Sequence, residues 1–303
     1  MDWTTMRFAD RRLALACAIL FPLGIQAAPL GYVSSFDRLY RVDLGTGQQT
    51  RVGDFRLAST ERVFDVEGLA FAPDGTLFAV SDASEVLMRV DATTGVTTVV
   101  GNLGLAGQGT GIGNNLDFGL AFTCDGRLWL SAETAQKLWE VNAATGATRA
   151  VGALGAKITG LAARGAQLYG IGASGDERLY RIDTATGAST VVGSALGSNI
   201  RFDDGGLDFD ADGNLWAVLD YRPTEPNRAS DLARIDASTG VASLTGRSIA
   251  DDGEGLAIAP PSCNTPTGAV AANVPTGTIP GQALLAALIV ALGGLALRWQ
   301  RRG

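Results

Sequence analysis

Acidic side chains recur at one position of this sequence, just before a Gly-Leu pair that returns along the chain. The residues at this position are Asp65 and Glu67, Asn115 and Asp117, Asp203 and Asp204, and Asp251, Asp252 and Glu254. Carboxylate and amide oxygens are the ligands that Ca²⁺ and Mg²⁺ prefer in proteins. If the fold gathers these positions, the sequence predicts a site for one of these cations with four metal ligands: Glu67, Asp117, Asp204 and Glu254.

Two interpretations of these residues remain open. In the first they bind a cation, and three neighbours would contact whatever else the site holds: Asn115, Asp203 and Asp252. In the second they cap strand ends and keep the surface solvated, without a ligand. Thr159 stands at the equivalent place before the third Gly-Leu pair, so a ring of acidic residues would be broken there.

The chain of 303 residues contains no histidine. This absence excludes Ser-His-Asp triads, histidine general bases and most zinc sites. Any catalysis would have to use carboxylates, amides or a hard metal ion, and no catalytic residue can be named from the sequence.

The acidic positions belong to a repeat whose clearest copy is residues 67–101. Four short runs rich in Val, Leu, Phe and Thr lie at 69–72, 76–81, 86–90 and 97–100, separated by turn residues. This pattern predicts a four-stranded antiparallel meander. Similar units follow at a period of 40 to 50 residues, which is typical of propellers.

The two ends of the repeat region complement each other. Residues 31–33, 39–43 and 50–53 match second, third and fourth strands without a first, whereas 255–259 matches a first strand without successors. Pairing the ends removes exposed sheet edges. We therefore predict an all-β fold, a closed five-bladed β-propeller of four-stranded antiparallel blades. A sixth blade would require hidden strands in 53–67 or 101–117.

The loops sort onto two faces. Short Asp-Gly hairpins and Asp-x-x-Thr-Gly turns recur in the blades, and we expect the side chains of these aspartates to cap their own backbone amides. Longer, irregular connections share the other face with the acidic positions, where recognition is more common. Tyr221 and Arg222, in the excursion 220–231, belong to no repeat position and are further ligand-contact candidates.

The composition of the sequence divides the chain into four segments. Residues 1–27 have arginines before an apolar run and small residues at the end, which predicts a signal peptide. The β-propeller spans 28–260, and a Pro/Thr/Gly/Ala-rich linker spans 261–280. Residues 281–303 form an apolar stretch followed by arginines, which predicts a transmembrane helix.

Removing both ends takes away six arginines and two aspartates, which leaves 18 basic against 29 acidic residues and a net charge of −11. Nucleic acid and anionic membrane surfaces are therefore disfavoured partners. Cys124 and Cys263 are the cysteines of the exported part, and an oxidising compartment would allow them to form a disulfide or leave them as free thiols.

The tail with Val274-Pro275-Thr276, an apolar helix and terminal arginines resembles the Ile-Pro-Thr-Leu type of C-terminal sorting signal of Gram-negative bacteria. Gly277 replaces the usual leucine. The resemblance implies a sortase-like membrane protease as partner, and a cell-envelope or outer-surface location. A plain single-span anchor is the alternative.

The Glu-Gly-Leu-Ala and Asp-Gly-Asn-Leu-Trp motifs resemble those of secreted bacterial propellers, including gluconolactonase-like and quinoprotein-like proteins. In gluconolactonase-like enzymes a Glu-Gly supplies a metal ligand, which implies Glu67 or Glu254 here. Those enzymes have six blades, and the proline after their Glu-Gly is Leu69 or Leu256 in this chain.

Two functions remain open from the sequence. The first is an exported binding module for a protein or polysaccharide. The second is a Ca²⁺- or Mg²⁺-dependent hydrolase or lactonase that uses the acidic residues. The sequence does not decide whether the protein is an enzyme, and it predicts no cofactor besides the cation.

Overall fold

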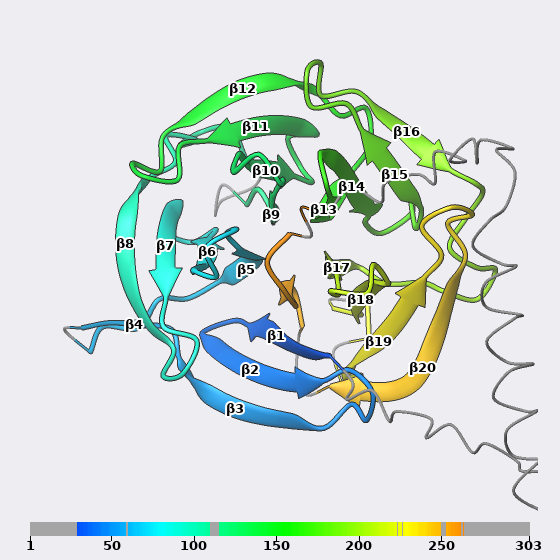
Figure 1. Ribbon diagram of the computed structural model, residues 1–303, viewed down its shortest axis with the longest axis horizontal. Helices are drawn as coiled ribbons and strands as arrows, with labels where there is room; N and C mark the ends of the chain where they lie inside the picture. Colours follow the sequence, from blue (N-terminus) through cyan, green and yellow to red (C-terminus); the bar gives the residue numbers. More distant parts are fainter. Residues whose placement is uncertain are drawn as a thin grey trace, which may run out of the picture.

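The computed structural model describes residues 29–58, 60–109, 115–222, 224–225, 227–249, 253–261 and 263. These residues form five mainly antiparallel sheets arranged around a central axis (Figure 1). The fold is therefore an all-β, five-bladed propeller, and the predicted fold class is confirmed for the described part of the chain.

Each blade runs from an inner strand to an outer strand. The first combines β21 (Leu256–Ala257), β1 (Leu30–Ser35), β2 (Arg38–Asp43) and β3 (Gln49–Asp54). The second contains β5 (Val66–Phe71), β6 (Leu77–Ser81), β7 (Val86–Val90), β8 (Val96–Asn102) and the short β4 (Arg56–Leu57).

The other three blades follow in chain order. The third consists of β9 (Phe118–Phe122), β10 (Leu128–Ala132), β11 (Lys137–Val141) and β12 (Thr148–Ala153). The fourth consists of β13 (Ile158–Arg164), β14 (Gln167–Gly172), β15 (Leu179–Ile182) and β16 (Ser189–Val192). The fifth consists of β17 (Asp204–Phe209), β18 (Leu215–Asp220), β19 (Ser230–Ile235) and β20 (Ala242–Ile249).

The propeller closes by pairing strands from opposite ends of the chain. Tyr32 pairs with Ala257 and Val33 with Leu256, and the amide of Ser34 donates to the carbonyl of Gly255 at 3.1 Å. In Figure 1 the orange β21 lies inside the blue strands of the first blade. The predicted closure is therefore confirmed.

In their described residues, the segments that could have held a sixth blade do not form one. β4 pairs in parallel with β8, through Arg56 and Val96, and so extends the second blade at its outer edge. In the second segment, the described residues 103–109 and 115–117 contain no strand.

The repeated turns have the structural role that the sequence predicts. Oδ1 of Asp91 accepts a hydrogen bond from the amide of Thr93 at 2.8 Å, and Asp236 caps Ser238 in the same way. In four of these turns the threonine carbonyl also packs on a glycine of the preceding blade, and the threonines are Thr94, Thr145, Thr186 and Thr239. A Cβ on Gly101, for example, would lie 2.0 Å from the carbonyl oxygen of Thr145.

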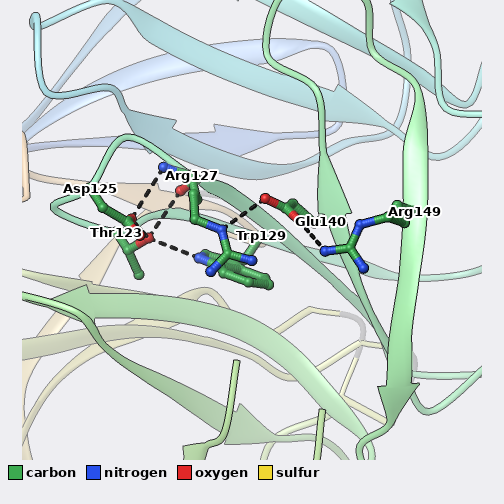
Figure 2. A network of polar contacts seen from close by, with 6 residues as sticks. All are labelled: Thr123, Asp125, Arg127, Trp129, Glu140 and Arg149. Carbon is green, nitrogen blue, oxygen red and sulfur yellow. Dashed lines mark hydrogen bonds and ion pairs between the residues drawn. The ribbon is translucent and has the colours of Figure 1, made fainter. Parts of the chain in front are cut away.

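Aromatic side chains of the second strands pack between blades. The rings of Phe78 and Phe122 lie 5.3 Å apart, as do those of Tyr169 and Phe209. Figure 2 shows the network around Trp129, whose Nε1 donates to Oγ1 of Thr123 at 2.9 Å. The guanidinium of Arg127 lies over the indole, 4.2 Å from its centroid, and donates a hydrogen bond to the carboxylate of Glu140. The same carboxylate also accepts a hydrogen bond from Arg149. These contacts are structural.

The channel along the propeller axis is nearly filled. The first-strand glycines approach the next strand so closely that a Cβ would meet its backbone, and Gly255 would place one 1.8 Å from the carbonyl oxygen of Glu67. The hollow between these strands is about 10 Å³, which is about the space of one water molecule. The packed first strands therefore block the channel below its acidic end.

Cys124 and Cys263 form a disulfide, with their Cα atoms 5.0 Å apart and a sequence separation of 139 residues. It ties the segment after β21 to the third blade. The predicted signal peptide and transmembrane segment lie outside the described residues, as does the predicted linker apart from residues 261 and 263. Within the described ranges, no helix is long and apolar enough to cross a membrane.

Candidate functional site

Three blades carry a pair of acidic residues at the same end of the propeller. In each pair one residue stands at the start of the first strand and the other at the end of the second strand. The pairs are Asp65 with Asp82, Asp117 with Glu133, and Asp204 with Asp220. Backbone hydrogen bonds hold the pairs in register. The amide of Asp82 donates to the carbonyl of Asp65 at 2.8 Å, and the amide of Glu133 donates to the carbonyl of Asp117 at 3.0 Å.

Two of these aspartates have left-handed backbone conformations. The φ angle is 55° at Asp65 and 51° at Asp117. Among residues with a side chain, aspartate is one of those that tolerate this region best, because its short polar group can bond locally. The turn into the first strand therefore favours aspartate at these two positions for conformational as well as chemical reasons.

Glu67 occupies a bulge in the first strand of the second blade. The register of β5 against β6 shifts between Val66 and Leu69, and Glu67 is an extra residue there. Its side chain is 4% exposed, and Oε2 accepts the amide of Phe118 at 2.5 Å. Burial raises the pKa of the Glu67 carboxyl well above its usual range, and the charge of Asp82 raises it further.

Asp82 lies beside Glu67 and is equally buried, with 5% of its surface exposed. Its Oδ2 accepts the amide of Leu116 at 2.9 Å. Burial is the main cause that raises the pKa of Asp82 to about 6. Carboxylate oxygens of Asp65, Glu67 and Asp82, one from each, all lie within 4.8 Å of one another.

A cavity of about 540 Å³ opens at the acidic mouth beside this group. Its acidic lining residues are Asp117, Glu133, Asp203, Asp204, Asp220 and Glu254. Burial raises the pKa of Asp117 to about 7, with a further contribution from the charge of Glu133. Burial, followed by the charge of Asp117, raises the pKa of Asp204 well above its usual range.

Two basic side chains meet the acidic group. Lys157 stands in the fourth blade where the second, third and fifth blades have aspartate, and its Nζ lies 3.0 Å from Oε1 of Glu133. Arg222 lines the cavity and covers the ring of Phe36 at 5.4 Å. The named carboxylates outnumber these two cations, so the mouth carries a negative field.

The structure brings together most of the residues predicted from the sequence. Asp117, Asp204 and Glu254 line the cavity with Asp203 and Arg222. Glu67 lies near enough for the charges of Asp117, Asp204 and Glu254 to raise its pKa. Asp203 accepts the amide and hydroxyl of Thr224 at 3.0 and 2.9 Å.

Tyr221 and Asn115 are not among the lining residues of this cavity. Tyr221 is 3% exposed, and its hydroxyl donates to Asp231 at 3.0 Å under the guanidinium of Arg228. Asn115 is exposed and its carbonyl accepts the hydroxyl of Thr134. Asp252 lies outside the described residues. Ligand contact and metal binding by all the candidates stay predictions.

Sequence reasoning missed the second member of every acidic pair. Asp82, Glu133 and Asp220 each end or directly follow a second strand. Aligning the repeats at that position would have revealed the recurrence, because antiparallel pairing brings the end of a second strand beside the start of the first.

Residues 68–214 match a family described as a repeat of unknown function (DUF6923). No curated protein matches the chain. Two solved structures are similar in fold. A structural genomics protein of unknown function from Bacteroides thetaiotaomicron is 15% identical with a TM-score of 0.46, over 64% of this chain and 54% of that one.

The second structure is virginiamycin B lyase from Staphylococcus aureus, which is 14% identical with a TM-score of 0.42. The match covers 72% of this chain and 69% of the lyase. The chain thus spans about half the length of the Bacteroides protein and about two thirds of the lyase. At these identities neither protein indicates what this chain binds.

Proposed function

We propose that this protein is an exported binding module whose acidic cavity holds the positively charged part of a ligand. The observation that carries the proposal is the cavity of about 540 Å³, lined by six carboxylates and closed below by the packed first strands. A basic segment of a protein fits this chemistry, because lysine or arginine side chains would neutralise the carboxylates. A polysaccharide would need a bridging cation.

Phe36 adds an apolar wall to the cavity. Its ring is 39% exposed and lines the same hollow as Asp204 and Glu254. An exposed aromatic ring beside carboxylates suits a lysine or arginine side chain, because the ring contacts its aliphatic stem or its charge. The combination favours a basic peptide over a small inorganic ion in the cavity itself.

The test is calorimetric titration of the full-length protein with oligolysine. We expect binding that weakens with salt and falls at least about tenfold in Asp117→Asn/Asp204→Asn, because the variant loses two carboxyls that can ionise against bound lysine side chains. Asp74→Asn, on the opposite face, serves as the matched control. Equal affinity for the wild type and the double variant would contradict the proposal, as would an absence of binding at low salt.

The second candidate function is a Ca²⁺- or Mg²⁺-dependent hydrolase or lactonase. One observation favours it: Asp117 and Glu133 form an acidic pair in the cavity lining, and burial together with the charge of Glu133 raises the pKa of Asp117 to about 7. A carboxyl with such a pKa can exchange protons near neutral pH. Hydrolysis of a simple δ-lactone by the wild type and not by Asp117→Asn would establish this function, and equal rates would exclude it.

We further propose export and envelope attachment. The disulfide between Cys124 and Cys263 supports an oxidising compartment. The N-terminal segment 1–27 would direct export, and a sortase-like protease would remove 281–303 or the segment would remain as an anchor. Mass measurement of the mature protein from envelope fractions distinguishes these outcomes. An N-terminus that still includes residue 1 would contradict export through a signal peptide.

A further inference from the structure

We propose that Asp65, Glu67 and Asp82 form a Ca²⁺ site within the second blade, separate from the cavity that holds the ligand. All three residues come from β5, β6 and the turns beside them. The site does not depend on the proposed function, since it stands whether or not the cavity binds a basic peptide. It also differs from the inter-blade ligand set that the sequence predicts.

The distances between the carboxylates suit a calcium ion. One oxygen from each residue lies within 4.8 Å of the other two. Ca²⁺ binds oxygen at about 2.3–2.6 Å, so oxygens on opposite sides of one ion are up to about 5 Å apart. The ion would fit between the three carboxylates without a change of fold, and solvent would complete its coordination. The tolerance of Ca²⁺ for irregular geometry favours it over Mg²⁺.

Asp82 provides the second, independent observation. Its side chain is 5% exposed, and Oδ2 is already used by the amide of Leu116. Oδ1 is buried, and among the residues that the structure describes it has no hydrogen-bond partner. A buried carboxylate oxygen without a donor is costly and calls for an explanation. A cation held between Asp65, Glu67 and Asp82 would provide the missing partner.

No protein cation takes this role in the described part of the chain. The ion pairs there involve other carboxylates, such as Glu133 with Lys157 and Asp37 with Arg62. Lys157 of the fourth blade forms an ion pair with Glu133, which is the second acidic residue of the pair in the third blade. The equivalent residue of the second blade is Asp82, which is in no described ion pair. The two blades thus differ in how their acidic pairs are neutralised.

The backbone holds the three residues in position before any ion binds. The amide of Asp82 donates to the carbonyl of Asp65 at 2.8 Å, which joins the start of β5 to the end of β6. Glu67 is fixed by the bulge and by its bond to Phe118. Such preorganisation lowers the ordering cost of binding.

The experiment is titration of the full-length, chelator-treated protein with Ca²⁺ by calorimetry and thermal melting. We expect one ion per chain, with a dissociation constant between about 10⁻⁵ and 10⁻³ M and a melting temperature that rises with Ca²⁺. Asp82→Asn and Asp65→Asn should each weaken binding at least about tenfold. Glu225→Gln removes an exposed charge of the loop 220–231, keeps these ligands and should retain the wild-type affinity within about threefold.

Three results would overturn this site. The first is no heat and no melting shift in the wild type at about 5 mM Ca²⁺. The second is unchanged affinity in both Asp82→Asn and Asp65→Asn. The third is an equal loss in Glu225→Gln, which would indicate diffuse attraction to the acidic mouth. Oligolysine titration of Asp82→Asn separates the two proposals, because the cavity should still bind the peptide when the calcium site is lost.

Discussion

Glu67 accepts a hydrogen bond from the backbone amide of Phe118, with 2.5 Å between Oε2 and the nitrogen. The two residues lie on the first strands of neighbouring blades, β5 and β9. One buried carboxylate therefore ties two blades together at the mouth while it contributes charge to the acidic group. Glu67 therefore has two roles, because it joins neighbouring blades and belongs to the acidic group that we propose binds ligands.

Replacing Glu67 separates these two roles. Glu67→Gln keeps an oxygen for the Phe118 amide and removes a charge next to Asp82, so its free energy of unfolding without Ca²⁺ should stay within about 1 kcal/mol of the wild type. Glu67→Ala leaves the buried amide without a partner and should cost about 2–4 kcal/mol. Urea unfolding measures both, and equal losses would show that the hydrogen bond is unimportant.

Gly101 tests the contact between blades. Alanine there would place a Cβ 2.0 Å from the carbonyl of Thr145, so Gly101→Ala should lower the free energy of unfolding by at least about 2 kcal/mol. Gly197→Ala is the control, because its new Cβ meets only side-chain atoms of Ile200, at 3.3 Å or more. Thermal melting compares the two, and a Gly101→Ala variant as stable as the control would refute this packing argument.

The disulfide should stabilise the closed ring. Cys124 and Cys263 are 139 residues apart, and cross-links over such loops contribute about 2–5 kcal/mol by restricting the unfolded chain. Cys263→Ser should therefore unfold at lower urea than the oxidised wild type. Reduction with dithiothreitol should lower the urea midpoint of the wild type to that of the variant and should leave the midpoint of the variant unchanged. An unaltered midpoint in the variant would contradict this role.

Asp208 predicts an unusual pH dependence. Its Oδ2 accepts the amide of Ile258 at 2.6 Å, and burial raises its pKa from 3.8 to about 7. Between these values the folded chain holds a proton that the unfolded chain releases. The stabilising contribution is thus complete below about pH 4 and is lost as the pH rises through about 7.

Melting at about pH 6 and pH 8 measures this effect. The wild type should be more stable at the lower pH, and Asp208→Asn should show a smaller difference because one titrating group is gone. The pKa values of Asp82 and Asp117 are also raised, so part of the change in stability with pH should remain in the variant. Identical pH slopes in the two proteins would exclude Asp208 as a contributor.

The repeat pattern predicts most of the fold because strand alternation and turn residues are local properties. The pairing of Val33 with Leu256 follows from counting strands at the two ends. The acidic pairs were only half predicted, since Asp82 and Asp220 meet their partners through strand register. The bulge at Glu67 lies next to Gly68, where a Cβ would be 2.8 Å from Cβ of Leu120 in the next blade. The alternation of residues does not encode this close approach.

The central claim is that the acidic mouth is the binding face, and hydrogen exchange with and without oligolysine tests it most directly. We predict slower exchange at mouth amides such as those of Gly205 and Thr224, next to Asp204 and Asp203. Exchange in the opposite-face turn at 91–95 should be unchanged. Protection confined to that turn, or no protection anywhere at saturating peptide, would contradict the claim.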